Sequence, residues 1–164
     1  MASPSLAPNG LPLESVWDYP RPPSVVPCER RVRVLHQETV VAESTRAVRV
    51  LETASPPTIY LPPEDVRAGL LEPASGQTVC EWKGTASYFD VVTDAGRVPR
   101  AAWAYADPKG RYAGLRDWLS FYPRLVECYL DDERVRPQAG EFYGGWVTDE
   151  IAGPHNGEPG SEGW

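Results

Sequence analysis

The sequence predicts a mainly β fold in which short strands are joined by loops rich in Pro and Gly. The chain of 164 residues contains 18 Pro and 14 Gly, which interrupt long helices. It also contains 6 Trp, 8 Tyr and 3 Phe, large side chains that suit strands. Apolar and polar residues alternate over several short segments. We therefore expect one globular domain of short strands, with one or two short helices.

The alternation locates the strands. Val32 and Val34 share one face of a strand while Arg31 and Arg33 share the other, as a half-buried strand requires. Further strands are expected at 39–43, 46–53, 78–82, 86–92, 97–105, 124–130 and 134–136. Gly84 is expected to interrupt or kink the chain between two of them.

Two short helices are expected between the strands. Pro63 suits the first turn of a helix, where Glu64 and Asp65 favour the positive end of the helix dipole. This helix would run to Leu71. A second helix is expected at 114–120, with its apolar side chains facing inward.

Composition divides the chain into three parts. Residues 1–30 are rich in Pro and Ser and predict an extended N-terminal arm. Residues 31–137 hold the predicted strands and form the β-rich core domain. Residues 138–164 are rich in Gly and predict a C-terminal tail packed on the core. The arm and the tail carry aromatic residues that could dock on the core or on a partner: Trp17, Tyr19, Phe142, Tyr143 and Trp146.

Charge and hydropathy exclude several classes of partner. The net charge of −7 and the pI of about 4.9 argue against nucleic acid, because phosphates would be repelled over most of the surface. No segment approaches the roughly 20 apolar residues that a membrane span needs. The N-terminal residues lack the basic start and apolar run of a secretory signal. We expect no contact with nucleic acid or membrane.

The cysteines indicate a cytoplasmic protein without a metal site. Cys28, Cys80 and Cys128 are an odd number and lie far apart, which fits reduced thiols better than a disulfide framework. Only His36 and His155 could join them, and no Cys-x-x-Cys pair occurs, so no zinc is expected. No Gly-rich phosphate loop is present, and we expect no cofactor.

Short motifs follow one another in a fixed order between Val40 and Asp132. They are Val41-Ala42-Glu43-Ser44, Arg49-Val50-Leu51-Glu52, Tyr60-Leu61-Pro62-Pro63-Glu64-Asp65-Val66, Cys80-Glu81-Trp82-Lys83-Gly84-Thr85-Ala86-Ser87-Tyr88, Ala101-Ala102-Trp103-Ala104-Tyr105, and Trp118 with Phe121-Tyr122. In this combination the chain resembles the uncharacterised family called domain of unknown function 427, and its flanks resemble those of longer actinobacterial members. The resemblance implies a compact domain in which two antiparallel sheets pack together as a tent, a small sandwich or a barrel. A nucleotidyltransferase label attached to the family finds no support, because the sequence lacks Gly-Ser followed by paired Asp residues that would hold Mg²⁺.

Side chains alternate between the two faces of a strand, and this alternation determines which residues between Cys80 and Tyr88 share a face. In one continuous strand, Cys80, Trp82 and Tyr88 would share a face and Lys83 would lie opposite. A bulge at Gly84 would reset the alternation and could turn Lys83 toward the aromatic face.

The neighbouring strand supplies more aromatic side chains. Ala101, Trp103 and Tyr105 would share one of its faces and extend the wall begun by Trp82 and Tyr88. Small residues beside large flat ones leave room for a ligand. The same aromatic residues could instead simply fill a small β core, where a buried Tyr also needs a hydrogen-bond partner.

The orientation of Lys83 decides whether such a cavity contains a charged group that could bind or react with a ligand. Facing the wall, it could stack on Trp, bind an anion or act as a base, with Glu52 as its complement at the end of an apolar strand face. Alternatively, Lys83 is exposed to solvent and Glu52 only ends a strand. The candidate catalytic residues are Lys83 and Glu52, and the candidate ligand-binding residues are Tyr60, Trp82, Tyr88, Trp103, Tyr105, Glu43 and Arg46.

Two functions remain open from the sequence. The first is a domain that binds a small organic ligand, or a small cofactor-free enzyme in which Lys83 and Glu52 transfer a proton. The second is a non-catalytic interaction domain, in which the aromatic arm and tail mediate self-association or partner binding. A homodimer is plausible in that second case, because Pro-rich arms often cross to a neighbouring subunit.

Overall fold

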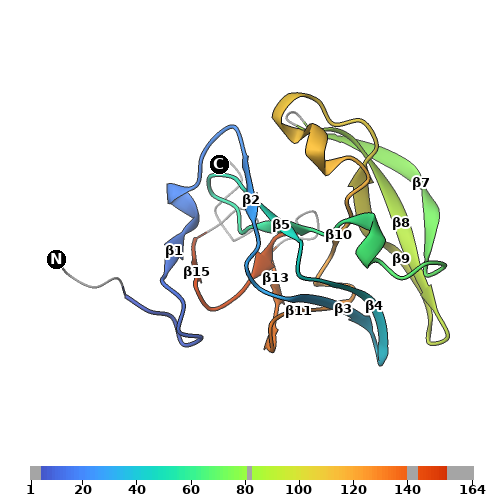
Figure 1. Ribbon diagram of the computed structural model, residues 1–164, viewed down its shortest axis with the longest axis horizontal. Helices are drawn as coiled ribbons and strands as arrows, with labels where there is room; N and C mark the ends of the chain where they lie inside the picture. The colour runs from blue at the N-terminus through green and yellow to red at the C-terminus, as the bar shows by residue number, and fades with distance from the viewer. Residues whose placement is uncertain (1–4, 81–82, 140–143, 155–164) are drawn as a thin grey trace.

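Short antiparallel strands make up most of the fold, so the expected mainly β architecture is confirmed. The computed structural model describes residues 5–80, 83–139 and 144–154 (Figure 1). Within these residues no sheet closes into a barrel, and the longest helical segment has six residues. The sheets are smaller and more numerous than the two that the resemblance implies.

One four-stranded sheet carries the strand that the Val and Arg alternation predicts. Its order is β12 (Glu133–Arg134), β11 (Glu127–Leu130), β3 (Val32–His36) and β4 (Thr39–Ser44). In β3, Val32 and Val34 are fully buried, whereas Arg33 is partly exposed. The predicted alternation of this strand is therefore confirmed.

A second four-stranded sheet lies mostly at the right of the view in Figure 1. Its order is β10 (Ser120–Phe121), β9 (Gly96–Tyr105), β8 (Gly84–Thr93) and β7 (Leu71–Cys80). The chain does not pass Gly84 as a kinked strand. It reverses there, because Cys80 pairs with Gly84 across a tight hairpin and Gly84 has a φ of +94°, which favours glycine.

A three-stranded sheet connects the two larger ones and separates two cavities. Its order is β2 (Ser24–Pro27), β5 (Val48–Leu51) and β6 (Thr58–Tyr60). Arg49 pairs with Val26 on one side and with Ile59 on the other, so these three side chains share one face. The side chains of Val50 and Thr58 share the opposite face. β2 lies within the segment expected to be an extended arm, which here supplies a strand.

The two ends of the described chain meet each other. β1 (Glu14–Ser15) pairs in parallel with β15 (Ile151–Ala152), at the end of the molecule opposite β7 (Figure 1). β13 (Arg136–Pro137) pairs with β14 (Trp146–Val147). Trp146 is buried, and its Nε1 donates a hydrogen bond to the Phe121 carbonyl at 3.0 Å. The C-terminal segment up to Pro154 thus packs against the rest of the chain.

The first expected helix, from Pro63 to Leu71, is wrong. Only a single 3-10 turn, η2 (Pro63–Asp65), forms, and β7 begins at Leu71. Val66 instead forms a β-bridge with Ala42, and the carboxylate of Asp65 accepts a hydrogen bond from Ser44 at 2.6 Å. Pairing with the end of β4 therefore overrides the local helix signals.

The second expected helix is displaced toward the N-terminus. A 3-10 helix, η3 (Gly110–Leu115), takes its place, and a third short helix, η1 (Val16–Asp18), was not expected. Leu119 exchanges two backbone hydrogen bonds with Leu61, at 2.8 and 2.9 Å. That pairing requires an extended backbone at Leu119, which ends any helix before it.

Two clusters of buried side chains hold the sheets together. The larger is mostly aliphatic and includes Val32, Val34, Val41, Leu61, Phe121 and Trp146. The smaller is mostly aromatic and includes Tyr60, Trp103, Tyr105 and Tyr112. Among the described residues, no helix is long and apolar enough to span a bilayer.

Candidate functional site

An aromatic cavity of about 440 Å³ lies between the three-stranded sheet and the β7–β10 sheet. One wall comes from the β5–β6 face on which Val50 and Thr58 lie, together with Tyr60 and Glu52. Glu52 follows β5 directly and lies two residues beyond Val50, so it keeps the same side of the chain. Glu52 and Tyr60, both expected in the site, therefore line one cavity.

The opposite wall comes from β8 and β9. Tyr88 pairs directly with Trp103, and Ala86 pairs with Tyr105, so the four side chains share one face. All four line the aromatic cavity. The prediction that Tyr88, Trp103 and Tyr105 lie on one face of paired strands is therefore confirmed. Trp82, the remaining member of the predicted wall, lies outside the described residues.

Lys83 lies inside the aromatic cavity. Its side chain is 7% exposed, and Nζ lies 5.8 Å from the ring centroid of Tyr105. The hairpin at Gly84 causes this orientation, because Lys83 occupies the turn and is released from strand alternation. The alternative of a solvent-exposed Lys83 is therefore wrong.

Tyr60 and Trp103 form the most buried polar contact of the cavity. Trp103 Nε1 donates to Tyr60 Oη at 3.1 Å, and the two rings meet edge to face with centroids 6.1 Å apart. Burial raises the pKa of the Tyr60 phenol, while the charge of Lys83 and hydrogen bonding from Trp103 act in the opposite direction. Tyr60 is thus a neutral hydroxyl held in place by an indole.

Further hydroxyl groups lie on the same face of the β7–β10 sheet. Tyr88 Oη and Thr78 Oγ1 are 2.7 Å apart, and the Tyr122 ring centroid lies 4.5 Å from that of Trp103. Burial raises the pKa of Tyr122, and neighbouring Tyr88 raises it further. Tyr122 is therefore a protonated hydroxyl at neutral pH.

The residues that line the cavity and that sequence reasoning missed include Tyr122, Gln138, Gly144 and Gly145. A Cβ at Gly144 would overlap the Trp103 ring, and a Cβ at Gly145 would overlap the Gln138 carboxamide. The Gly145 N–H donates to Gln138 Oε1 at 3.1 Å. A Gly-Gly pair between aromatic residues is typical of a close backbone approach, and that signal could have indicated the contact.

Two predicted ligand-binding residues do not lie in the cavity. Glu43 forms an ion pair with Arg31 on the exposed side of the β3–β4 pair. Arg46 pairs with Asp65 at 2.9 Å and is 60% exposed. Their positions beside the family motif suggested the site, but both side chains point to solvent and find surface partners. Glu43 and Arg46 therefore do not line the aromatic cavity with the other predicted residues.

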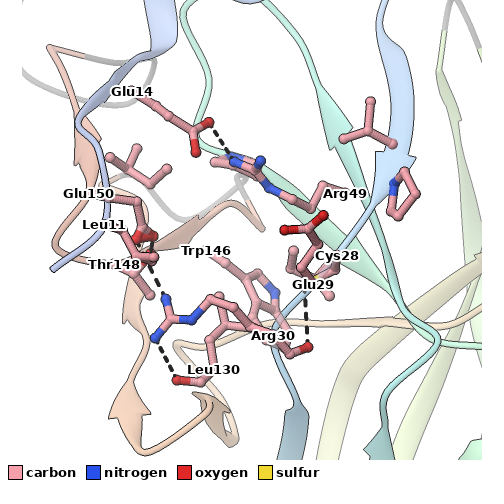
Figure 2. Close-up of a pocket in the computed structure, with 15 residues that line it drawn as sticks. Leu11, Glu14, Cys28, Glu29, Arg30, Arg49, Leu130, Trp146, Thr148 and Glu150 are labelled. Carbon is pink, nitrogen blue, oxygen red and sulfur yellow. Dashed lines mark hydrogen bonds and ion pairs between the residues drawn. The ribbon is translucent and has the colours of Figure 1, made fainter. Parts of the chain in front are cut away.

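A second cavity, here called the terminal cavity, lies on the opposite face of the three-stranded sheet (Figure 2). Its volume is about 370 Å³, and Arg49 and Ile59 belong to its wall. Figure 2 shows Arg49 directed toward Glu14, at an Nη2–Oε1 distance of 2.7 Å. Cys28, in the same wall, is buried, and burial raises the pKa of its thiol.

Arg30 is the centre of an ion-pair network beside the terminal cavity. It pairs with Asp131 and Glu133 at 3.0 Å each and with Glu150 at 3.5 Å. It also donates to the Leu130 carbonyl at 2.8 Å (Figure 2). The network therefore fastens the C-terminal segment to the turn between β11 and β12.

The aromatic residues of the arm and tail are mostly packed within the chain. Tyr19 is buried and donates to Glu14 at 2.9 Å, and Trp146, the first residue of β14, is buried as well. Trp17 is 44% exposed, although its Nε1 donates to the Pro154 carbonyl at 2.8 Å. Phe142 and Tyr143 lie outside the described residues.

The fold and the site together define a mainly β domain with an aromatic cavity between two of its sheets. A family model described as Domain of unknown function (DUF427) matches residues 24–132, more than half of the chain, and the chain belongs to this family. A search of the curated proteins found no match. The match includes Glu52, Lys83 and Trp103 but ends before Gly144, so the C-terminal wall of the cavity lies beyond it.

Proposed function

We propose that this protein binds a small organic ligand in the aromatic cavity. The observation that carries the proposal is the position of Lys83, a buried side chain that lines the same cavity as Tyr60, Trp103 and Tyr105. Ligand sites are commonly cavities of a few hundred Å³ with apolar walls and a few convergent polar groups. The volume of about 440 Å³ falls in that range.

Core packing alone explains the rings but not the polar lining. Rings that only filled a core would have apolar neighbours, whereas a ligand site combines apolar walls with a few polar groups. Here Lys83, Glu52 and Gln138 line the same space as Trp103. This mixture of flat apolar surface and charge favours ligand recognition over simple filling.

A reaction in this cavity would be a proton transfer. Lys83 and Glu52 are the two ionisable groups of opposite charge in its walls, and each can exchange a proton with a bound molecule. No redox or metal chemistry is required for such a step. The binding proposal stands whether or not this transfer occurs.

A cytoplasmic location is part of the same proposal. Cys28 and Cys128 are buried free thiols, which suits a reducing compartment. The acidic net charge of −7 supports the absence of a nucleic-acid partner.

Self-association is the second candidate function, and one observation favours it. Three of the four large apolar side chains that are exposed in the described structure lie in the N-terminal segment: Leu6 at 62%, Leu13 at 48% and Trp17 at 44%. Exposed apolar side chains that gather in one segment are typical of an interaction surface. This surface would form a homodimer without involving the aromatic cavity.

A fragment screen tests the binding proposal. The melting temperature of the full chain is measured with a library of small aromatic and aliphatic compounds, and the hits are repeated with Trp103→Leu and Trp17→Leu. We expect hits that stabilise the wild type and Trp17→Leu but not Trp103→Leu, because both variants lose an indole and only one loses a cavity wall. Circular dichroism confirms that each variant folds. A library without hits, or hits that fully persist in folded Trp103→Leu, would refute the proposal.

A further inference from the structure

The strands on both sides of β8 contain bulges that meet near Tyr88. Residues 74–76 of β7 lie opposite Tyr88 alone, and residues 99–101 of β9 lie opposite Asp90 alone. A bulge redirects the side chains of its strand, and bulges are common beside binding sites. Tyr88 lines the aromatic cavity, so the two bulges lie at its edge.

Arg100, in the middle of the β9 bulge, has a backbone conformation that suits glycine better than arginine. Its φ is +51°, and its N–H donates to Asp90 Oδ1 at 2.8 Å, which holds this conformation. Residues other than glycine are strained at positive φ, and such strain is concentrated at binding and active sites. The presence of an arginine here therefore directs attention to its side chain.

The guanidinium group of Arg100 is held in one place over the ring of Tyr88. Its Cζ lies 4.1 Å from the ring centroid, and its Nη1 donates to the Ser75 carbonyl in the β7 bulge. Gly76 leaves room for this group, because a Cβ at Gly76 would lie 2.9 Å from Nη1. The two bulges together thus position one guanidinium group.

Arg100 keeps hydrogen-bond donors that face solvent. The residue is exposed, and within the described part of the chain its Nε and Nη2 have no protein acceptor and no carboxylate pairs with it. The nearby carboxylates of Asp90 and Glu72 instead pair with Arg97. A guanidinium group stacked on a ring still offers the N–H groups at its edge, and this edge fits two oxygens of a carboxylate or phosphate.

Arg100 lies at the boundary between the aromatic cavity and solvent. Tyr88, which contacts its guanidinium, is half-buried and lines the cavity. Burial raises the pKa of Tyr122, another residue of the cavity wall, and the charge of Arg100 acts in the opposite direction. In a protein with a net charge of −7, a cation at this boundary creates a local site for an anion.

Resting on the proposed function, we infer that Arg100 binds an oxyanion of the ligand, a carboxylate or a phosphate, at the rim of the aromatic cavity. Nε and Nη2 donate to the oxyanion, while Nη1 stays on the Ser75 carbonyl. The uncharged part of the ligand occupies the cavity beside Tyr88.

Matched acids and amides test this inference: phenylacetate with phenylacetamide, 3-phenylpropionate with 3-phenylpropanamide, and phenyl phosphate for the phosphate arm. The two lengths allow for the distance from the cavity to Arg100. Each compound is titrated calorimetrically into the full chain at pH 7. We expect at least one anion to bind about fivefold more tightly than either amide, as for an exposed charge-assisted contact. An amide that binds as tightly as every anion overturns the inference.

The order of the anions identifies the oxyanion. Tighter binding of phenyl phosphate than of both carboxylates supports the inference and assigns a phosphate to the ligand. The reverse order supports the inference and assigns a carboxylate.

Variants test whether the preference depends on Arg100. Asn accepts positive φ and carries no charge, so the preference for the anion should fall below about twofold in Arg100→Asn. Arg100→Gly also suits the positive φ and should behave in the same way. The matched control is Arg134→Asn, because Arg134 is also exposed and lies over a tyrosine ring, that of Tyr129 at 5.6 Å, and this variant should keep the full preference. A folded Arg100→Asn or Arg100→Gly protein that keeps the wild-type preference overturns the inference and leaves Arg100 a structural role only.

The fragment screen separates the failure of this inference from the failure of the proposed function. If fragments give hits that depend on Trp103 but no anion binds more tightly than the amides, the role of Arg100 is wrong and the binding function stands. If the screen gives no hits and no probe binds, the binding function itself is wrong, and the role of Arg100 is wrong with it.

Discussion

The two faces of the β2–β5–β6 sheet carry cavities of similar size and opposite chemistry. The terminal cavity measures about 370 Å³ and the aromatic cavity about 440 Å³. In the terminal cavity, Arg49 and Arg30 face carboxylates of the same chain, Glu14 and Glu150. The aromatic cavity is lined mainly by rings, among them Trp103 and Tyr105. Volume therefore does not distinguish the two cavities, but the kind of side chain in their walls does.

This difference indicates different tasks for the two faces. An ion pair that joins distant segments contributes its full effect only when both partners are present, which suits a structural fastening. The terminal cavity joins Glu14 and Glu150, near the two ends of the described chain, to the central sheet and to Arg30. The aromatic cavity instead combines aromatic walls with a few polar groups. We expect substitutions at the first to change stability and substitutions at the second to change binding.

The largest expected effect is that of Arg30→Met. Removing the guanidinium leaves Glu133 and Glu150, 15% and 6% exposed, without their shared cation, which typically costs about 3 kcal/mol. The free energy of unfolding in urea should fall by that amount, while fragment binding to the folded variant stays unchanged. Arg31→Met is the matched control, because its pair with Glu43 is exposed and should contribute under about 1 kcal/mol. Equal losses in the two variants would contradict the structural task of the network.

The next largest effect is expected for Gly144→Ala. The new Cβ overlaps the Trp103 ring, so the ring must move, at a cost of about 1–3 kcal/mol. Fragment binding should weaken more than tenfold, because the flat wall is displaced. Gly114→Ala adds a methyl group where no atom lies within 4 Å, and it should leave stability and binding near the wild type. Unchanged Trp fluorescence and binding in Gly144→Ala would show that the glycine does not set the wall.

A smaller effect should appear in the dependence of stability on pH. Burial alone would raise the pKa of Glu133, but hydrogen bonds from Asn9, the Asp149 N–H and Arg30 lower it below its ordinary value of 4.5. A lowered folded-state pKa stabilises the fold above pH 4.5, and this contribution is lost as the pH falls through the folded-state value. The melting temperature of the wild type should therefore decrease below about pH 5. This decrease in melting temperature should be shallower in Arg30→Met. If the melting temperatures of both proteins fall equally with pH, Glu133 does not cause the decrease.

The smallest effect on stability is expected for the double substitution of Leu6→Ser and Leu13→Ser. Both side chains are exposed, so the free energy of unfolding should change by less than about 0.5 kcal/mol per site. If the N-terminal segment mediates a homodimer, multi-angle light scattering should show the mass falling from two chains to one. A mass that is the same in both proteins would exclude this surface as the interface.

The face of a strand on which each side chain lies was predictable from the sequence, because it depends only on neighbouring residues. Val32 and Val34 are buried as expected, and Trp103 and Tyr105 share the face that alternation assigns to them. Tyr60 could be grouped with them from its motif alone. These successes concern side chains whose direction is set by a period of two.

Contacts between distant segments were not predictable in the same way. The approach of Gly144 to Trp103 and the pairing of Glu14 with Arg49 join parts of the chain that have no local relation. The expected helix after Pro63 failed because Val66 pairs with β4, a tertiary contact that outweighs weak helix signals. Nearness to a motif along the chain likewise did not bring Arg46 to the cavity, because its side chain points to solvent.

The hairpin turn at Gly84 separates the charge of the aromatic cavity from its walls. Tyr88, Trp103 and Tyr105 are fixed by the paired strands β8 and β9, whereas Lys83 is carried by a turn of a few residues between β7 and β8. A turn can change in length or sequence without disturbing the pairing of the strands beside it. The scaffold can therefore exchange the charged group of the cavity by altering this turn alone, while the aromatic walls stay constant.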